Sequence, residues 1–229
     1  MSQNIYDNPS FYASYASLPR SLEGLSVGAA PEWPALRRYL PSLQHKSFLD
    51  LGCGMGWYSR FAHSQGASEV LGIDLSEKML ARANELTFDP SISFSKGDLE
   101  NIKLEKEKWD VVFSALALHY VVNLPTLVKE IFAGLRPGGS FVFSVEHPIF
   151  TAPRKQQFRE VDGRKVWELN AYLEEGERVT EWLGQKGVVK QHRMVGTYVE
   201  LLVEAGFEIR GLCDWGPSKE QIENKECDC

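Results

Sequence analysis

The chain has 229 residues, of which 43% are hydrophobic, and it carries a formal net charge of −6. This length and composition predict a single domain, residues 1–229, with one sizeable core, and the acidic balance argues against nucleic acid as a partner. No run of about 18 apolar residues and no basic leader is present, so we expect a cytoplasmic protein that does not enter a membrane.

Residues 1–45 are expected to form a helical arm ahead of the first strand. Large apolar and aromatic side chains recur there at roughly helical spacing, at Tyr6, Phe11, Tyr12, Tyr15 and Leu18. A second helical stripe, over residues 31–40, begins with a proline and leads into the first strand. An aromatic stripe is typical of a helix packed on the core, and it also suits an arm that closes over a ligand.

The most informative stretch is residues 48–56, FLDLGCGMG, where an apolar strand carrying Asp50 opens into a glycine-rich turn before a helix. Gly52 and Gly54 allow a positive φ and bring backbone N–H groups close to a ligand. The pattern therefore predicts a nucleotide-type cofactor site. A dinucleotide fingerprint would place its third glycine where this chain has Trp57, and this bulky residue weakens the case for NAD.

The second strand, residues 70–74, ends in an acidic side chain. Asp74 lies 20 residues after Gly54, close to the spacing of about 20 at which an acid binds ribose hydroxyls. A carboxylate can accept hydrogen bonds from both hydroxyls of a diol. Because Asp74 ends a strand at an open crevice, we expect its replacement by alanine to weaken cofactor binding and to leave the fold intact. Ser76 is the predicted N-cap of the helix that follows.

Three more strands follow with helices between them. Residues 91–99 alternate small polar with apolar side chains and end at Asp98, residues 109–114 are apolar throughout, and residues 135–144 contain a Pro-Gly-Gly turn. Helical patterns cover residues 57–65 and 124–135. This alternation predicts the α/β class, with a Rossmann-like, doubly wound and mostly parallel sheet.

These stretches together resemble the class I S-adenosylmethionine-dependent methyltransferases. Residues 50–56 look like the first motif of that family, and the run LRPGG at 135–139 is similar to the one before its fifth strand. The resemblance implies S-adenosylmethionine (SAM) as cofactor and a sheet of order 3-2-1-4-5-7-6. It implies that Asp74 holds the ribose, that Asp98 binds the adenine amine and that Leu99 packs on the ring. The full set of expected contacts in the core is Asp50, Gly52, Cys53, Gly54, Asp74, Leu75, Met79, Asp98, Leu99, Ser114 and Leu116.

The resemblance extends loosely to the arm. If the arm closes over SAM, Tyr15 lies beside the methionine end and Arg20 pairs with the methionine carboxylate, for which a guanidinium fork is geometrically suited. The alternative is that both residues belong to a helix packed on the core.

Two histidines are candidate catalytic residues. His119 follows the fourth strand, where the family lines its methyl-transfer pocket, and His147 follows the fifth strand. The methyl group of SAM is already activated, so a base is needed only where the nucleophile must lose a proton. A histidine in an apolar run is also commonly a packing residue, and this interpretation stays open for both.

The predicted organisation has four parts within one domain: the arm (1–45), a SAM-binding core (46–148), a charged insert that acts as a lid or substrate-binding element (149–193) and a C-terminal segment (194–229). In the last part we expect a helix over 197–205 capped by Gly206, then a sixth strand at 207–212. The 14 residues after Trp215 do not resemble the antiparallel seventh strand. We therefore expect a sequence cut short before that strand, with an exposed edge that favours self-association as a homodimer.

The sequence thus predicts an enzyme that moves a methyl group from SAM to an O, N or C atom of an unidentified small molecule by in-line transfer. Two alternatives are retained: an NAD-dependent Rossmann oxidoreductase and a non-catalytic SAM-binding protein. No metal is expected, because Cys227 and Cys229 form only half of a structural zinc site.

Overall fold

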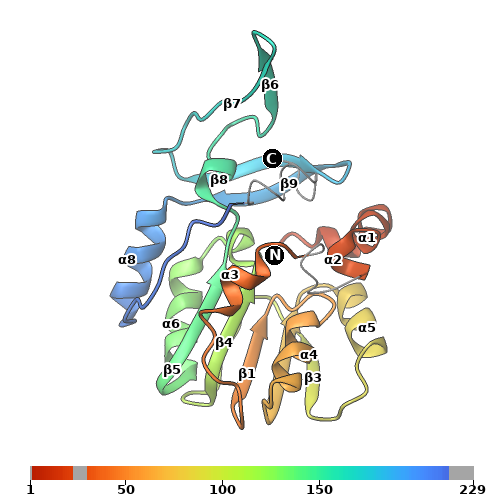
Figure 1. Ribbon diagram of the computed structural model, residues 1–229, viewed down its shortest axis with the longest axis vertical. Helices are drawn as coiled ribbons and strands as arrows, with labels where there is room; N and C mark the ends of the chain where they lie inside the picture. Colours follow the sequence, from red (N-terminus) through yellow and green to blue (C-terminus); the bar gives the residue numbers. More distant parts are fainter. Residues whose placement is uncertain (1, 23–29, 217–229) are drawn as a thin grey trace.

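A computed structural model describes residues 2–22 and 30–216. Its centre is a five-stranded sheet of order β3-β2-β1-β4-β5, in which all neighbouring strands are parallel (Figure 1). The strands are β1 (Ser47–Leu51), β2 (Glu69–Asp74), β3 (Ile92–Lys96), β4 (Trp109–Ala115) and β5 (Leu135–Ser144). The predicted fold class and this part of the strand order are confirmed.

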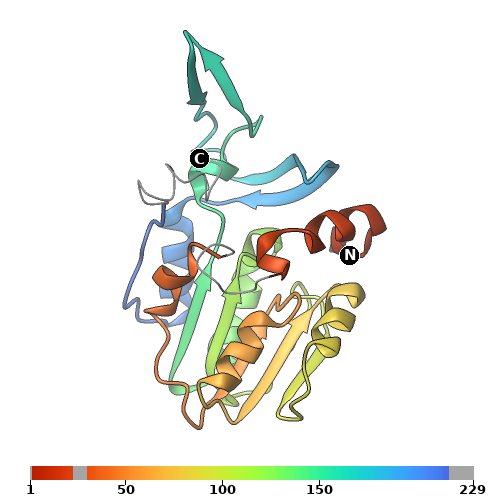
Figure 2. The same ribbon diagram turned by 45° about the vertical axis from the view of Figure 1, so that its right-hand side comes forward.

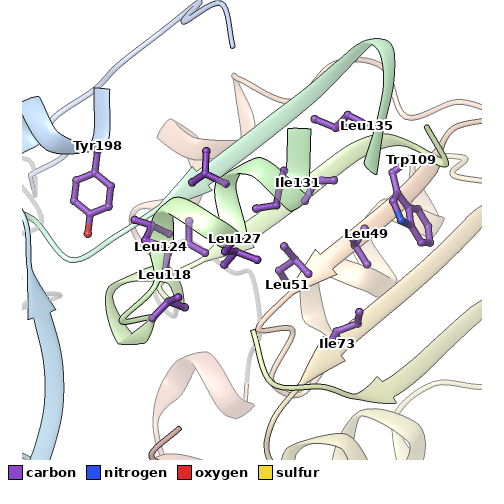
Figure 3. Packing of buried hydrophobic residues seen from close by; sticks show 13 residues of the cluster. Leu49, Leu51, Ile73, Trp109, Leu118, Leu124, Leu127, Ile131, Leu135 and Tyr198 are labelled. Atoms are coloured by element: carbon purple, nitrogen blue, oxygen red, sulfur yellow. The ribbon is translucent and has the colours of Figure 1, made fainter. Parts of the chain in front are cut away.

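Two apolar layers cover the faces of the sheet. Successive residues of a strand point to opposite faces; in β1, Phe48 belongs to one buried cluster and Leu49 to the other. The first cluster packs under α3 (Trp33–Arg37) and α4 (Trp57–Ser64). The second packs under α6 (Leu124–Gly134) and α8 (Val195–Ala205), and Figure 3 shows its side chains gathered between β1, β4 and α6.

Residues 2–22 of the arm form η1 (Ile5–Asp7), α1 (Pro9–Ala16) and α2 (Pro19–Leu22), and α3 follows in the described residues after 30. The segment 2–22 lies beside α5 (Glu77–Glu85), on the side of the sheet's carboxyl ends (Figures 1 and 2). The helical stripe of the sequence is therefore split into three short pieces. Asn8 caps α1, because its side chain accepts hydrogen bonds from the amides of Ser10 and Phe11.

The insert folds into two antiparallel hairpins that the weak periodicity of the sequence does not predict. They are β6 (Phe158–Val161) with β7 (Arg164–Trp167), and β8 (Gly176–Trp182) with β9 (Gln185–His192). Each turn contains two residues of positive φ, Asp162-Gly163 and Leu183-Gly184. Asp-Gly is a strong hairpin signal, and it marks the first turn in the sequence. The second hairpin lies over the carboxyl ends of the strands (Figure 2), where β9 contacts η2 (Leu118–Tyr120).

The predicted sixth strand at 207–212 is wrong. Gly206 ends α8 in the left-handed conformation, as expected, but residues 207–216 form neither strand nor helix. Phe207 packs on Phe132 and Phe141, whereas residues 208–216 are exposed. In the expected order the sixth strand pairs with the seventh, and no strand of the described residues occupies the seventh position. The predicted absence of a seventh strand after residue 216 lies outside the described residues.

No helix among the described residues is both long and apolar enough to cross a membrane. These residues also contain no cluster of three or more metal-ligating side chains.

Candidate active site

The glycine-rich turn joins β1 to α4 and is held by the end of β2. The amides of Gly52 and Cys53 both donate to the carbonyl of Ile73, at 2.8 and 3.0 Å. Gly52 and Gly54 have φ values of +73° and +53°. A Cβ on Gly52 would lie 2.4 Å from the Cβ of Ala117, whereas a Cβ on Gly54 would have no protein atom within 4 Å. Gly54 thus borders open space that a ligand can occupy.

Asp74 lies at the end of β2 and accepts two backbone hydrogen bonds. Its Oδ2 accepts from the amide of Gly54 and its Oδ1 from the amide of Ser76, both at 2.8 Å. Burial raises the pKa of this carboxyl, although the two amide hydrogen bonds act in the opposite direction. A carboxylate has about four acceptor positions, so about two remain for the hydroxyls of a ribose.

Asp50 lies beneath the turn and is almost fully buried. Its Oδ2 accepts from the hydroxyl of Ser59 at 2.7 Å, while its Oδ1 has no partner among the described residues. Burial raises the pKa of Asp50 to about 7, with a smaller contribution from the charge of Asp74. A buried acceptor without a donor is costly, and a bound group that supplies a donor would remove this cost.

Asp98 and Leu99, the residues expected at the adenine, follow β3 and are partly exposed. The Oδ1 of Asp98 accepts from the hydroxyl of Ser2 at 2.6 Å and from the amide of Glu100 at 3.1 Å. Burial raises the pKa of Asp98, but these hydrogen bonds outweigh it and the net shift is downward. The arm therefore already touches the predicted adenine-binding acid.

The arm is fixed to the start of α5 by Asp7, which the sequence did not single out. The Oδ1 of Asp7 accepts from the hydroxyl of Ser76 at 2.6 Å and from the amide of Lys78 at 3.1 Å. A carboxylate at the start of a helix stabilises it, because it accepts hydrogen bonds from the free amides of the first turn and its negative charge interacts favourably with the helix dipole. The side chain of Asn4, which precedes Asp7 in the arm, donates to the carbonyl of Leu75 at 3.4 Å. Asp7 and Ser76 are 69 positions apart in the chain, so no local pattern in the sequence indicates their contact.

Tyr15 lies near enough to Arg20 and to Asp74 for both charges to act on its pKa. The charge of Asp74 contributes to the raised pKa of Tyr15, for which burial is the main cause. The Nη2 of Arg20 donates to Glu32 Oε1 at 2.9 Å. Arg20 thus has a carboxylate partner within the chain, and its predicted contact with the methionine carboxylate stays a prediction.

The predicted contacts at β4 and α5 differ in their accessibility. Leu116 is partly exposed and has a φ of +53°, a strained value for a residue other than glycine. Ser114 is fully buried and its hydroxyl donates to the carbonyl of Leu51 at 2.8 Å. The side chain of Met79 is 2% exposed. Ser114 and Met79 therefore offer little side-chain surface to a ligand.

His119 lies at the carboxyl end of β4 in a buried position. Its Nδ1 accepts from the amide of Glu146 at 3.3 Å, which leaves the ring proton on Nε2. Burial lowers the pKa of His119 to about 3, and the charges of Lys190 and Arg193 add to this effect. The imidazole is consequently neutral and can donate from Nε2, but it is a poor base.

His147 has a structural explanation. Its Nδ1 accepts from the amide of Ile149 at the start of α7 (Pro148–Thr151), and its Nε2 is 3.2 Å from Asp214 Oδ1. Both ring nitrogens are thus engaged in interactions within the chain.

An aromatic cluster and an ion pair complete the site, and sequence reasoning had not connected them. The rings of Tyr6, Phe11 and Tyr15 in the arm pack edge-to-face on Trp182 of the second hairpin. Lys190 of the same hairpin pairs with Glu146 at 2.8 Å. The arm, β5 and the hairpin therefore meet above the carboxyl ends of β1 and β4.

Comparison with known proteins agrees with this geometry. A family model described as a methyltransferase domain matches residues 49–143. The solved structure of an S-adenosylmethionine-dependent methyltransferase from Mesorhizobium loti is 45% identical, with a TM-score of 0.81 over 87% of this chain and 91% of that one. The chain belongs to the class I SAM-dependent methyltransferases.

The other relatives do not identify the methyl acceptor of this protein. An uncharacterised protein from Haemophilus influenzae is 34% identical over 91% of this chain and 85% of its own length. A malonyl-[acyl-carrier protein] O-methyltransferase from Enterobacter lignolyticus is 34% identical over 56% of this chain. The chain spans about half the length of that relative, 50%.

SAM is the cofactor of this methyltransferase, so the NAD-dependent alternative is set aside. The described residues fit the methyl donor: Gly54 borders open space, Asp50 has an unpartnered oxygen and Asp74 retains acceptor positions. Burial raises the pKa of the Cys53 thiol well above its usual range. Such a thiol is unreactive, so Cys53 can contact the cofactor as a small side chain but is not a nucleophile.

Proposed function

We propose that this methyltransferase acts on a small molecule that binds between the glycine-rich turn and the second hairpin. The observation that carries the proposal is the aromatic cover formed by Tyr6, Tyr15 and Trp182. The charge of Asp74 reaches Tyr6 and Tyr15, since it contributes to the raised pKa of both, although burial is the main cause. The same two rings contact Trp182, 6.4 and 6.1 Å between centroids. The cover thus links the cofactor residues to the insert.

In this proposal the residues of the chain bind and orient, and no residue of the chain is methylated. Asp74 would hold the ribose hydroxyls, Asp98 the adenine amine, and Asp50 would receive a hydrogen bond from the methionine end. SAM supplies an electrophilic methyl group on a sulfonium. The aromatic cover excludes water and leaves one line of approach for the acceptor atom.

His119 is assigned a positioning function rather than that of a base. Its Nδ1 already accepts a hydrogen bond and its pKa lies near 3, so it cannot take a proton at neutral pH. The Nε2–H group can donate a hydrogen bond to the acceptor molecule. This assignment revises the catalytic function considered for His119 from the sequence.

Calorimetric titration of the purified protein with SAM, S-adenosylhomocysteine and NAD tests the first part of the proposal. We expect the first two to bind in the micromolar range and NAD not to bind. Incubation with methyl-labelled SAM and a metabolite extract, with malonyl-[acyl-carrier protein] as a separate acceptor because relatives act on it, then tests transfer. Label in a small molecule, or on the malonyl group carried by the carrier protein, supports the proposal. Label only in other macromolecules contradicts it, and SAM binding without any transfer favours the non-catalytic alternative.

A further inference from the structure

The hydrogen-bonding groups around the end of β4 are nearly all donors. This property follows from three side chains on two elements: His119 and Tyr120 of η2, and Lys190 of β9. The rings of His119 and Tyr120 lie 4.5 Å apart between centroids. Lys190 lies 5.5 Å from the centroid of Trp182, which also contacts the arm.

His119 and Tyr120 each keep one proton available. The Nδ1 of His119 receives the amide hydrogen of Glu146, so its Nε2 carries the proton. The ring of Tyr120 packs edge-to-face on that of Tyr6 in the arm, with 6.4 Å between the ring centroids. Burial raises the pKa of Tyr120, so its hydroxyl group keeps its proton at neutral pH and can act as a hydrogen-bond donor.

Positive charge surrounds the same place. Lys190 is 6% exposed, and among the described residues its ammonium group has one carboxylate partner, Glu146. Arg193 is also buried; its Nη2 donates to the carbonyls of Val121 and Val122, whereas its Nη1 has no partner among the described residues. Two buried cations and one acid leave an excess of positive charge beside His119.

Candidate bases are scarce in this region. His119 is fixed as a neutral donor, Tyr6, Tyr15 and Tyr120 hold their protons because burial raises the pKa of each, and Glu146 is engaged with Lys190. An acceptor that had to lose a proton during the reaction would find no free base among these groups. An acceptor that is already ionised needs none.

We propose that the methyl acceptor is a carboxylic acid, bound as its carboxylate by His119 Nε2, the Tyr120 hydroxyl and the Lys190 ammonium group. A carboxylate is an acceptor-only group, so it complements a lining that is rich in donors. One carboxylate oxygen attacks the methyl carbon, the carbon–sulfur bond breaks and its electron pair passes to sulfur. The products are a methyl ester and S-adenosylhomocysteine, and no proton is released.

This inference rests on the proposed function, and its test separates the two. Titration with SAM comes first, because loss of SAM binding would contradict the proposed function itself. The protein saturated with S-adenosylhomocysteine is then titrated with acetate, malonate, benzoate and phenylacetate, each beside its amide. We expect at least one carboxylate to bind and its matched amide to bind at least about tenfold more weakly.

Three variants locate the binding. Tyr120→Phe removes one donor and keeps the ring, and the double variant Lys190→Gln with Glu146→Gln removes the cation without leaving its partner unpaired. Both should lose about tenfold or more in carboxylate affinity and keep their affinity for SAM. Lys186→Gln, which removes an exposed charge from the same hairpin, is the matched control and should bind the carboxylate normally.

The reaction gives a second measurement. With methyl-labelled SAM, mass spectrometry should detect a methyl ester, and the rate should stay nearly constant between about pH 6 and pH 9, where a carboxylate is fully ionised. The proposal is overturned by a protein that binds SAM but no carboxylate of the set, by transfer only to amines or phenols, or by Tyr120→Phe and the double variant both binding carboxylate as well as Lys186→Gln does.

Discussion

Replacing Asp74 by asparagine should weaken SAM binding and destabilise the ligand-free protein. The carboxylate accepts from the amides of Gly54 and Ser76, both at 2.8 Å. An asparagine can accept only one of these hydrogen bonds well, and its NH₂ group then faces the other amide. Loss of one hydrogen bond to a charged group costs about 1.5–3 kcal/mol of stability. Alanine would remove both hydrogen bonds, so it should also lower the stability of the protein, and the expectation that the fold stays intact remains a prediction.

The same change should remove a charged acceptor from the ribose. One lost hydrogen bond of about 1.5–3 kcal/mol corresponds to a rise in the dissociation constant of about 10- to 150-fold. Calorimetry gives this constant and urea unfolding gives the stability. Asp110→Asn is the control, because Asp110 also accepts from a backbone amide and a hydroxyl, those of Ser47, but at the amino ends of β4 and β1, the opposite end of the strands from Asp74. An Asp74→Asn protein with unchanged SAM affinity would refute the assignment, whatever its stability.

Three further outcomes are expected. Gly54→Ala should keep most of its thermal stability and lose SAM affinity in calorimetry, whereas Gly52→Ala should unfold at a clearly lower temperature because its Cβ would lie 2.4 Å from that of Ala117; equal stability of the two variants contradicts this geometry. The pKa of Asp50 is raised to about 7 in the folded state, so the free energy of unfolding of the ligand-free protein should fall by at most about 4 kcal/mol as pH rises from about 4 to about 7. Urea unfolding should show no such decrease for Asp50→Asn. If Arg20 binds the methionine carboxylate, calorimetry should show weaker SAM binding for Arg20→Gln and equal or tighter binding for Glu32→Gln. Equal losses of SAM affinity in both variants would mean that the Arg20–Glu32 ion pair supports the fold and does not bind SAM.

The sheet and the glycine-rich turn could be predicted because their signals are local. An apolar strand, the glycines and Asp74 lie within short segments, and period and spacing identify them. The contacts of the arm could not be predicted in this way. Asp7 caps a helix whose first residue is 70 positions further along the chain, and no periodicity marks such a partner.

For residues 207–212 a local pattern was present but the predicted strand does not form. The apolar residues of 207–212 alternate like those of a strand, but a strand needs a neighbour with free backbone groups. Ile209 is 38% exposed in the absence of one. In the same way, Glu146 pairs with Lys190 only because the second hairpin folds over the carboxyl ends of the strands. The sequence does not predict this hairpin, so it could not predict the donor-rich lining around His119.

The contact between Ser2 and Asp98 has a practical consequence for expression of the protein. The second residue of the chain lies 2.6 Å from the carboxylate assigned to the adenine, and Gln3 exchanges hydrogen bonds with Gly187 and Val189 of the second hairpin. Residues fused ahead of this point would start directly beside the carboxylate that is proposed to bind the adenine. An amino-terminal purification tag would thus alter the very surface that a ligand-binding measurement is meant to examine, and it should be cleaved before such a measurement.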